Sequence, residues 1–214
     1  MGHRSDSDSS SDDERKHWWS KDQKYEKDKH RRHHDAHHPH LSEQLATHSP
    51  LHTPVFSPSG HRVPLSTESQ LPFPFAQIGG VAFYDADGTS PTYIGSAIME
   101  RSVQPCKVAP NLAPSVCRVA YGGVEIEHRG RYDVLPTNNE IMEWVDTGYG
   151  RIPDGRRPVE GGFEETGEKL YHGVALVQNE PALWVLGKCG EHLGGCHIPF
   201  NGEEMFFEES YAIL

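Results

Sequence analysis

Two stretches of nine residues decide the fold: Cys-Arg-Val-Ala-Tyr-Gly-Gly-Val-Glu at residues 117–125 and Cys-His-Ile-Pro-Phe-Asn-Gly-Glu-Glu at residues 196–204. They align without a gap at an offset of 79 residues, and the same offset places residues 132–135 on residues 211–214. Self-similarity at a fixed offset is the mark of a duplicated structural unit. We therefore predict two tandem copies of one small unit, at residues 71–140 and 141–214.

Each copy has the texture of β-strands joined by turns. Apolar and polar residues alternate around Val119 and Ile198, which is the period of a half-buried strand. Glycine at positions 123 and 202 suits a turn that needs a positive φ. No long stretch keeps the 3.6-residue apolar period of a helix. The sequence predicts an all-β fold: one compact domain with pseudo-twofold symmetry, preceded by a disordered tail.

Residues 1–70 form that predicted tail. They hold an acidic serine run, eleven of the fifteen histidines and few apolar residues, a composition that buries too little surface to offset the entropy of ordering it. Trp18-Trp19 is its clearest apolar anchor. Ser49, Thr53 and Ser57 each precede a proline, so this segment reads as a stiffened linker with potential phosphoacceptors.

Composition also narrows the partners and the compartment. Residues 71–214 carry 10 Lys and Arg against 20 Asp and Glu, a net charge of −10 that would repel a phosphate backbone and excludes nucleic acid as a partner. The sequence has no run of about 18 apolar residues, so we expect no membrane insertion. Its polar opening residues lack an apolar signal segment, which predicts a cytoplasmic protein and leaves unconventional export open.

The cysteine content fits that expectation. Cysteine occurs only at positions 106, 117, 189 and 196. In a chain without a signal segment, these residues are expected to be reduced, partly buried thiols and not a disulfide framework.

The second copy contains the most specific motif. Residues 187–204 combine a Gly-Lys turn, a Cys-x-apolar-Pro-aromatic strand and a Gly-x-Glu turn, and Glu143-Trp144-Val145 matches the opening of such a unit. Over residues 79–214 the chain resembles the DM-nine (Drosophila melanogaster nine) repeat family. This resemblance implies one β domain made of two repeats, acting in innate recognition as a mannose-binding lectin that pairs into homodimers.

The resemblance also implies the binding residues. In the family, an acidic residue early in each repeat and the lysine of a Pro-Gly-Lys turn contact sugar hydroxyls. The matching residues are Glu164 and Lys188 in the second repeat and Asp85 and Lys107 in the first. Glu164 stands where the family has Asp, and Asp87 is an alternative to Asp85.

This donor and acceptor set suits a neutral sugar. A carboxylate accepts from two adjacent hydroxyls, an ammonium donates to their oxygens, and neither has to change its protonation state. An aromatic face at Tyr84 or Phe163 can cover the apolar side of the ring. Because such shallow sites bind weakly, useful affinity would come from two sites per chain and from dimerisation.

Structural interpretations stand beside these assignments. Lys107 and Lys188 could be exposed turn lysines in surface ion pairs of little energetic value. Glu125 and Glu204 follow a glycine turn at a strand edge, which favours a structural hydrogen-bonding role over ligand contact.

Metal binding is the other alternative. Cys189, His192, Cys196 and His197 can be drawn as a zinc site, but neighbouring residues of a strand point to opposite faces, so we expect no metal and no cofactor. The histidines of the tail could hold a transition metal loosely.

The sequence carries no catalytic signature. It has no nucleophile elbow, no P-loop and no Gly-x-Gly-x-x-Gly motif after a strand. Glu164-Glu165 are sequence neighbours, a spacing that does not suggest the facing carboxylates of a glycosidase. The sequence predicts a non-catalytic, carbohydrate-binding recognition protein of the mannose type. The alternative is an intracellular protein-interaction scaffold with a phosphorylatable disordered tail.

Overall fold

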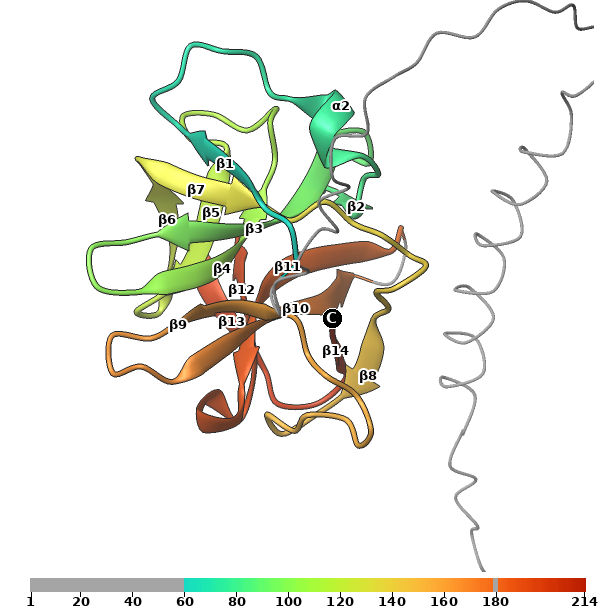
Figure 1. Cartoon of the computed structure of the whole chain (residues 1–214). Helices are drawn as coiled ribbons and strands as arrows, with labels where there is room; N and C mark the ends of the chain where they lie inside the picture. Colours follow the sequence, from blue (N-terminus) through green and yellow to red (C-terminus); the bar gives the residue numbers. More distant parts are fainter. Residues whose placement is uncertain (1–59, 179–180) are drawn as a thin grey trace, which may run out of the picture. The chain divides into compact units, whose positions relative to one another are not determined.

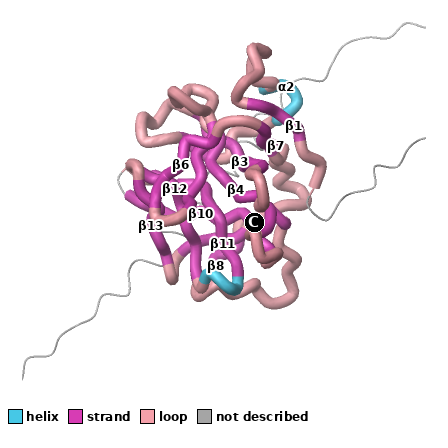
Figure 2. Tube along the Cα trace, turned by 90° about the vertical axis from the view of Figure 1, so that its left-hand side faces the viewer, coloured by secondary structure: helices cyan, strands magenta, loops and turns pink. Residues whose placement is uncertain are grey.

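The computed structural model describes residues 60–178 and 181–214 (Figure 1). The predictions for Trp18-Trp19, the Ser/Thr-Pro sites and the histidine run lie outside these residues. Strands and loops make up nearly all of the described chain, whose helical segments are one turn of α2 (Phe75–Ile78) and the 3-10 turn η1 (Glu191–Leu193) (Figure 2). The predicted all-β class is confirmed. No helix of the described chain is long and apolar enough to span a membrane.

The strands fall into two consecutive sets. The first set comprises β1 (Val63–Ser66), β2 (Phe83–Tyr84), β3 (Pro91–Ile98), β4 (Val103–Val108), β5 (Cys117–Tyr121), β6 (Val124–His128) and β7 (Arg131–Val134). The second set comprises β8 (Val145–Thr147), β9 (Glu160–Phe163), β10 (Lys169–Gln178), β11 (Leu183–Gly190), β12 (Gly195–Phe200), β13 (Glu203–Phe207) and β14 (Tyr211–Ile213).

The order of strands in the sheet relates the two sets. It runs β1-β7-β3-β4-β5-β6-β13-β12-β11-β10-β14-β8, with β2 pairing β3 and β9 pairing β10 beside that path. Replacing each strand of the first set by the strand at the same place in the second set gives the same order read from the other end. The two sets therefore share one pairing pattern about the β6–β13 junction, and β9 also pairs with β4 of the first set.

The first set begins earlier than the predicted boundary at residue 71. Val63 of β1 pairs with Val134, just as Val145 of β8 pairs with Ile213. Residues 60–70 therefore belong to the folded domain, and their assignment to a disordered tail was wrong. Their opening signal was hidden because Arg62-Val63 takes the place of Trp144-Val145, and their strand finds its partner only in the distant β7.

The two hairpin turns confirm the glycine prediction. The β5–β6 loop has positive φ at Gly122 (65°) and Gly123 (85°), and the β12–β13 loop has positive φ at Asn201 (53°) and Gly202 (84°). Two-residue loops of this conformation match the twist of the strands they join, and they favour Gly and Asn.

The two hairpins also lock onto each other. Gly202 N donates to Glu125 Oε2 at 2.9 Å, and Gly123 N donates to Glu204 Oε2 at 2.6 Å. Each glutamate thus satisfies a backbone donor in the turn of the other set. This reciprocal contact is the structural role expected for Glu125 and Glu204.

Each set has its own apolar core built from matching positions. Tyr93, Cys117 and Tyr132 lie in the first core, and Tyr171, Cys196 and Tyr211 lie in the second. All four cysteines are free and fully buried, where part burial had been expected. Burial raises the pKa of the tyrosine hydroxyls at 132 and 211 to about 12.

Candidate functional site

Lys107 and Lys188 are buried strand residues. Lys107 lies on β4 and Lys188 on β11, and each is only 4% exposed. The expectation of a lysine-bearing turn was wrong, and so was the alternative of exposed surface lysines. Both faces of these strands are covered: Cys106, next to Lys107, packs in the first core, while the lysine faces the opposite way.

The first lysine is paired with Asp85. Its Nζ lies 3.3 Å from Asp85 Oδ1 and 3.4 Å from Oδ2, and both side chains are nearly covered, at 6% and 10% exposed. Asp87 serves a different purpose. It accepts hydrogen bonds from Ser90 and from the Thr89 backbone, which lower the pKa of its carboxyl to about 2, so it shapes the loop and does not substitute for Asp85.

The second lysine is paired with Glu164. Lys188 Nζ lies 3.4 Å from Glu164 Oε1, and the side chains are 5% and 16% exposed. Glu164 reaches this place because β9 lies directly against β4. A Cβ at Gly162 would fall 1.9 Å from the Val103 carbonyl oxygen, so only glycine permits the approach.

Two residues from the first set complete the surroundings of Lys188. Lys188 Nζ donates to Gln104 Oε1 at 2.9 Å, and it lies 5.1 Å from the centroid of the Tyr121 ring. A cation over an aromatic face is stabilised by the quadrupole of the ring. The second pair is therefore built by both sets of strands.

The strands next to the lysines carry a further ionic layer. His197 on β12 is the cross-strand neighbour of Lys188, and its Nδ1 lies 3.1 Å from Glu204 Oε1. Burial opposes ionisation of Glu204, but the nearby His197 imidazole and the hydrogen bond from the Gly123 backbone lower its pKa overall. In the first set, Arg118 takes the corresponding place, 3.5 Å from Glu125.

This arrangement separates the residues considered for zinc. Cys196 lies in the second core, whereas the adjacent His197 faces Glu204. Within residues 60–178 and 181–214, no group of three or more His, Cys, Asp or Glu side chains is placed to hold a metal ion.

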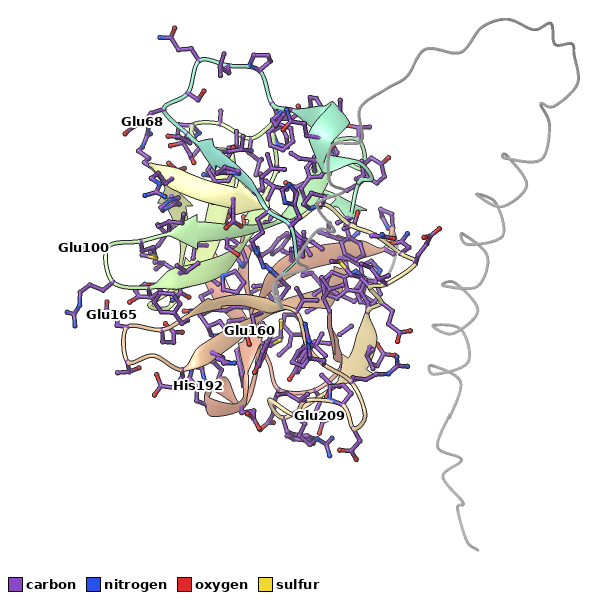
Figure 3. The ribbon with its side chains drawn as sticks, in the orientation of Figure 1. Glu68, Glu100, Glu160, Glu165, His192 and Glu209 are labelled. Carbon is purple, nitrogen blue, oxygen red and sulfur yellow. The ribbon has the colours of Figure 1, made fainter. Side chains whose placement is uncertain are left out.

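An exposed aromatic ring precedes each carboxylate. Tyr84 is 53% exposed and precedes Asp85, and Phe163 is 45% exposed and precedes Glu164. Figure 3 shows Glu165 on the β9–β10 loop near the β3–β4 loop, where its carboxylate lies 3.3 Å from Arg101. Each carboxylate of the two pairs keeps a small accessible part, 10% at Asp85 and 16% at Glu164.

The family model of the DM9 repeat matches residues 85–207, which is more than half of the chain. The matched range contains both ion pairs, Asp85–Lys107 and Glu164–Lys188. The chain belongs to the DM9 repeat family. DM9 repeats are carbohydrate-binding recognition modules. A comparison with curated proteins finds no match.

The buried charges of this DM9 domain are costly for stability. Removing an ammonium and a carboxylate from water carries a penalty that their attraction barely repays, and apolar side chains of similar volume often serve stability as well or better. The DM9 domain nevertheless holds such a pair at the same place in each strand set. Charged groups kept at this cost are candidates for function.

Sequence reasoning missed Gln104 and Tyr121. Both belong to the first set yet surround the second lysine, and no spacing signal links them to Lys188. A separate cavity of about 250 Å³ lies around β8 and Leu214 and includes none of the four paired residues.

Proposed function

We propose that this chain is a non-catalytic recognition protein that binds mannose-type glycans at its Asp85–Lys107 and Glu164–Lys188 pairs. The observation that supports this most strongly is the recurrence of a buried lysine paired with a largely covered carboxylate at matching places in both sets of strands. Membership of a carbohydrate-binding family supports the class of ligand.

The chemistry of binding follows from the atoms present. The carboxylate oxygens accept hydrogen bonds from two adjacent hydroxyls, and the ammonium donates to a hydroxyl oxygen. Tyr84 or Phe163 covers the apolar face of the ring. No group has to gain or lose a proton, so the arrangement serves recognition and assigns no catalytic role.

Affinity for polymeric glycans would come from multiplicity. One shallow site forms few contacts with a monosaccharide, whereas two sites on one chain, doubled in a homodimer, raise the effective concentration of each further contact. The homodimer is part of the proposal, and sedimentation velocity with and without a branched mannose glycan measures it.

Lysine removal tests the proposal. Lys107→Met and Lys188→Met each delete one ammonium while keeping an apolar stem. We expect each single variant to retain one site and the double variant to bind mannose at least about tenfold more weakly, because a hydrogen bond to a charged group is lost at both sites. Isothermal titration with methyl mannoside and retention on mannose-agarose are the measurements.

The matched control is Arg156→Met. Arg156 also forms an ion pair, with Glu143, but both side chains are 56% exposed and Arg156 lines the separate cavity around β8. Its substitution should leave mannose binding unchanged. Unaltered retention by the double lysine variant would overturn the lectin proposal. If the wild-type chain does not bind mannose but binds a protein partner through residues 1–59, the result would favour the scaffold alternative.

A further inference from the structure

Gln104 is the most deeply placed polar side chain at the second pair. It is fully buried, and its amide bridges the ion pair: Oε1 accepts from Lys188 Nζ at 2.9 Å, and Nε2 donates to Glu164 Oε2 at 2.7 Å. Both contacts are shorter than the direct Lys188–Glu164 distance of 3.4 Å. The amide therefore orients both partners at once.

Within residues 60–178 and 181–214, no side-chain amide bridges the first pair. Lys107 approaches both oxygens of Asp85 directly, at 3.3 and 3.4 Å. The strand register identifies the residue that corresponds to Gln104: Ala97 pairs with Gln104, and Ala175, at the place of Ala97, pairs with Val185. At matching positions the first set therefore carries Gln104 and Asp85, and the second set carries Val185, which packs in the second core, and Glu164.

The longer side chain of Glu164, compared with Asp85, gives a physical reason for an additional hydrogen-bond partner at the second pair. Glutamate has one more rotatable bond than aspartate, so a carboxylate at position 164 has more orientations to lose on binding. The Gln104 amide holds Oε2, which leaves Oε1 toward Lys188. A site fixed in its binding geometry before the ligand arrives binds more tightly than one that must be ordered by it.

The geometry points to Gln104 as the positioning residue of the second site, matched to Glu164: its amide holds this longer carboxylate toward Lys188, whereas the corresponding positions of the other set are Val185 and Asp85. This inference rests on the proposed function, because its main consequence is measured as sugar binding. It assigns to the second site a residue from the opposite set, so the second site is complete only when both sets are packed together.

A double-mutant cycle tests the match. In a Lys107→Met background, which silences the first site, Gln104→Val and Glu164→Asp should each weaken methyl mannoside binding by about tenfold, since each breaks one half of the match. The double variant carries the residue types of the corresponding positions, valine and aspartate, and its affinity should return to within about threefold of the background. Gln104→Met keeps the volume without the hydrogen bonds and should behave like Gln104→Val.

A readout without ligand keeps this test independent of sugar binding. The Lys188 ammonium should give a slowly exchanging signal in ¹H–¹⁵N spectra, because it is buried and hydrogen-bonded. In the otherwise unmodified chain, Gln104→Val and Gln104→Met should broaden that signal, and adding Glu164→Asp to Gln104→Val should restore it. The Lys107 signal should not change, which shows that the fold is intact.

The outcomes separate the two claims. If wild type fails to bind mannose but the Lys188 signal follows the cycle, the proposed function fails and the positioning role stands. If the double variant is no better than the single variants in binding and in the Lys188 signal, Gln104 is a structural residue only and the inference is overturned.

Discussion

A lysine–carboxylate ion pair occurs in both sets of strands, whereas the hydrogen bonds of Arg62 form a cluster that occurs once among the described residues. We call this second group the Arg62 cluster. Arg62 donates to Ser96 Oγ and Asp133 Oδ1 in the first set, each at 2.9 Å. It also donates to the Glu160 carbonyl at 2.6 Å and to His172 Nε2 at 3.0 Å in the second set. One guanidinium therefore ties the two sets together.

The matching positions of the described chain hold no second cluster of this kind. Arg62 corresponds to Trp144 in the second set. His172, the cross-strand neighbour of Lys188, corresponds to Ile94, the cross-strand neighbour of Lys107. The hairpin turns, the apolar core and the lysine–carboxylate pair recur at matching places in both sets. The Arg62 cluster joins the two sets without a counterpart among the described residues. The following predictions test that division, from the largest expected effect to the smallest.

Arg62→Ala should have the largest effect on stability. It removes four hydrogen bonds and leaves the partly buried Asp133 carboxylate without its cation, a loss that we expect to cost about 3 kcal/mol. The free energy of unfolding from urea titration measures it. Arg101→Ala is the control, because this exposed arginine pairs with Glu165 and should cost less than about 1 kcal/mol. Equal losses in the two variants would contradict the role given to the cluster.

Acid should weaken the same contact through His172. Burial, and secondarily the Arg62 charge, hold the pKa of His172 well below its usual value of 6.5. Below pH 6.5 this histidine is therefore protonated in the unfolded chain but stays neutral in the folded chain. We expect this histidine to contribute a fall in the unfolding free energy of about 1 kcal/mol per pH unit below that point.

The measurement compares urea titrations at pH 7.5 and pH 5.5. His172→Ile places the residue of the first set at the same position and should remove this part of the pH dependence. Asp133, whose burial raises the pKa of its carboxyl, remains in the variant, so the difference isolates His172. A variant with the same pH slope as wild type would show that His172 titrates freely.

The reciprocal glutamates should show the smallest and most nearly equal effects. Glu125→Gln and Glu204→Gln each weaken one charge-assisted bond to a turn N–H, with an expected cost of about 1 kcal/mol. Each carboxylate also meets a basic side chain, Arg118 at 3.5 Å from Glu125 and His197 at 3.1 Å from Glu204, so the two losses should agree to within about 0.5 kcal/mol. Thermal unfolding of the two variants side by side measures both losses. A clearly larger loss in either variant would contradict this equivalence.

The candidate site was predictable in part. The family resemblance singled out Lys107 and Lys188 together with Asp85 and Glu164, and these carboxylates lie 3.3 and 3.4 Å from their lysines. Their location on buried strands was not predictable, because alternation shows that Lys107 faces away from Cys106 but not what covers that other face. Gln104 left no signal at all, since it acts on the opposite set and its counterpart there is Val185.

The sequence by itself determined the duplication pattern, the all-β class and the turns, because these depend on local periodicity and on residues such as Asn201-Gly202 that tolerate positive φ. Only the tertiary structure decided that β1 opens the first set, that Arg62 joins the two sets and that Gln104 bridges the second pair. These contacts join residues far apart in the chain, and packing between faces leaves no period in the sequence for a reader to find.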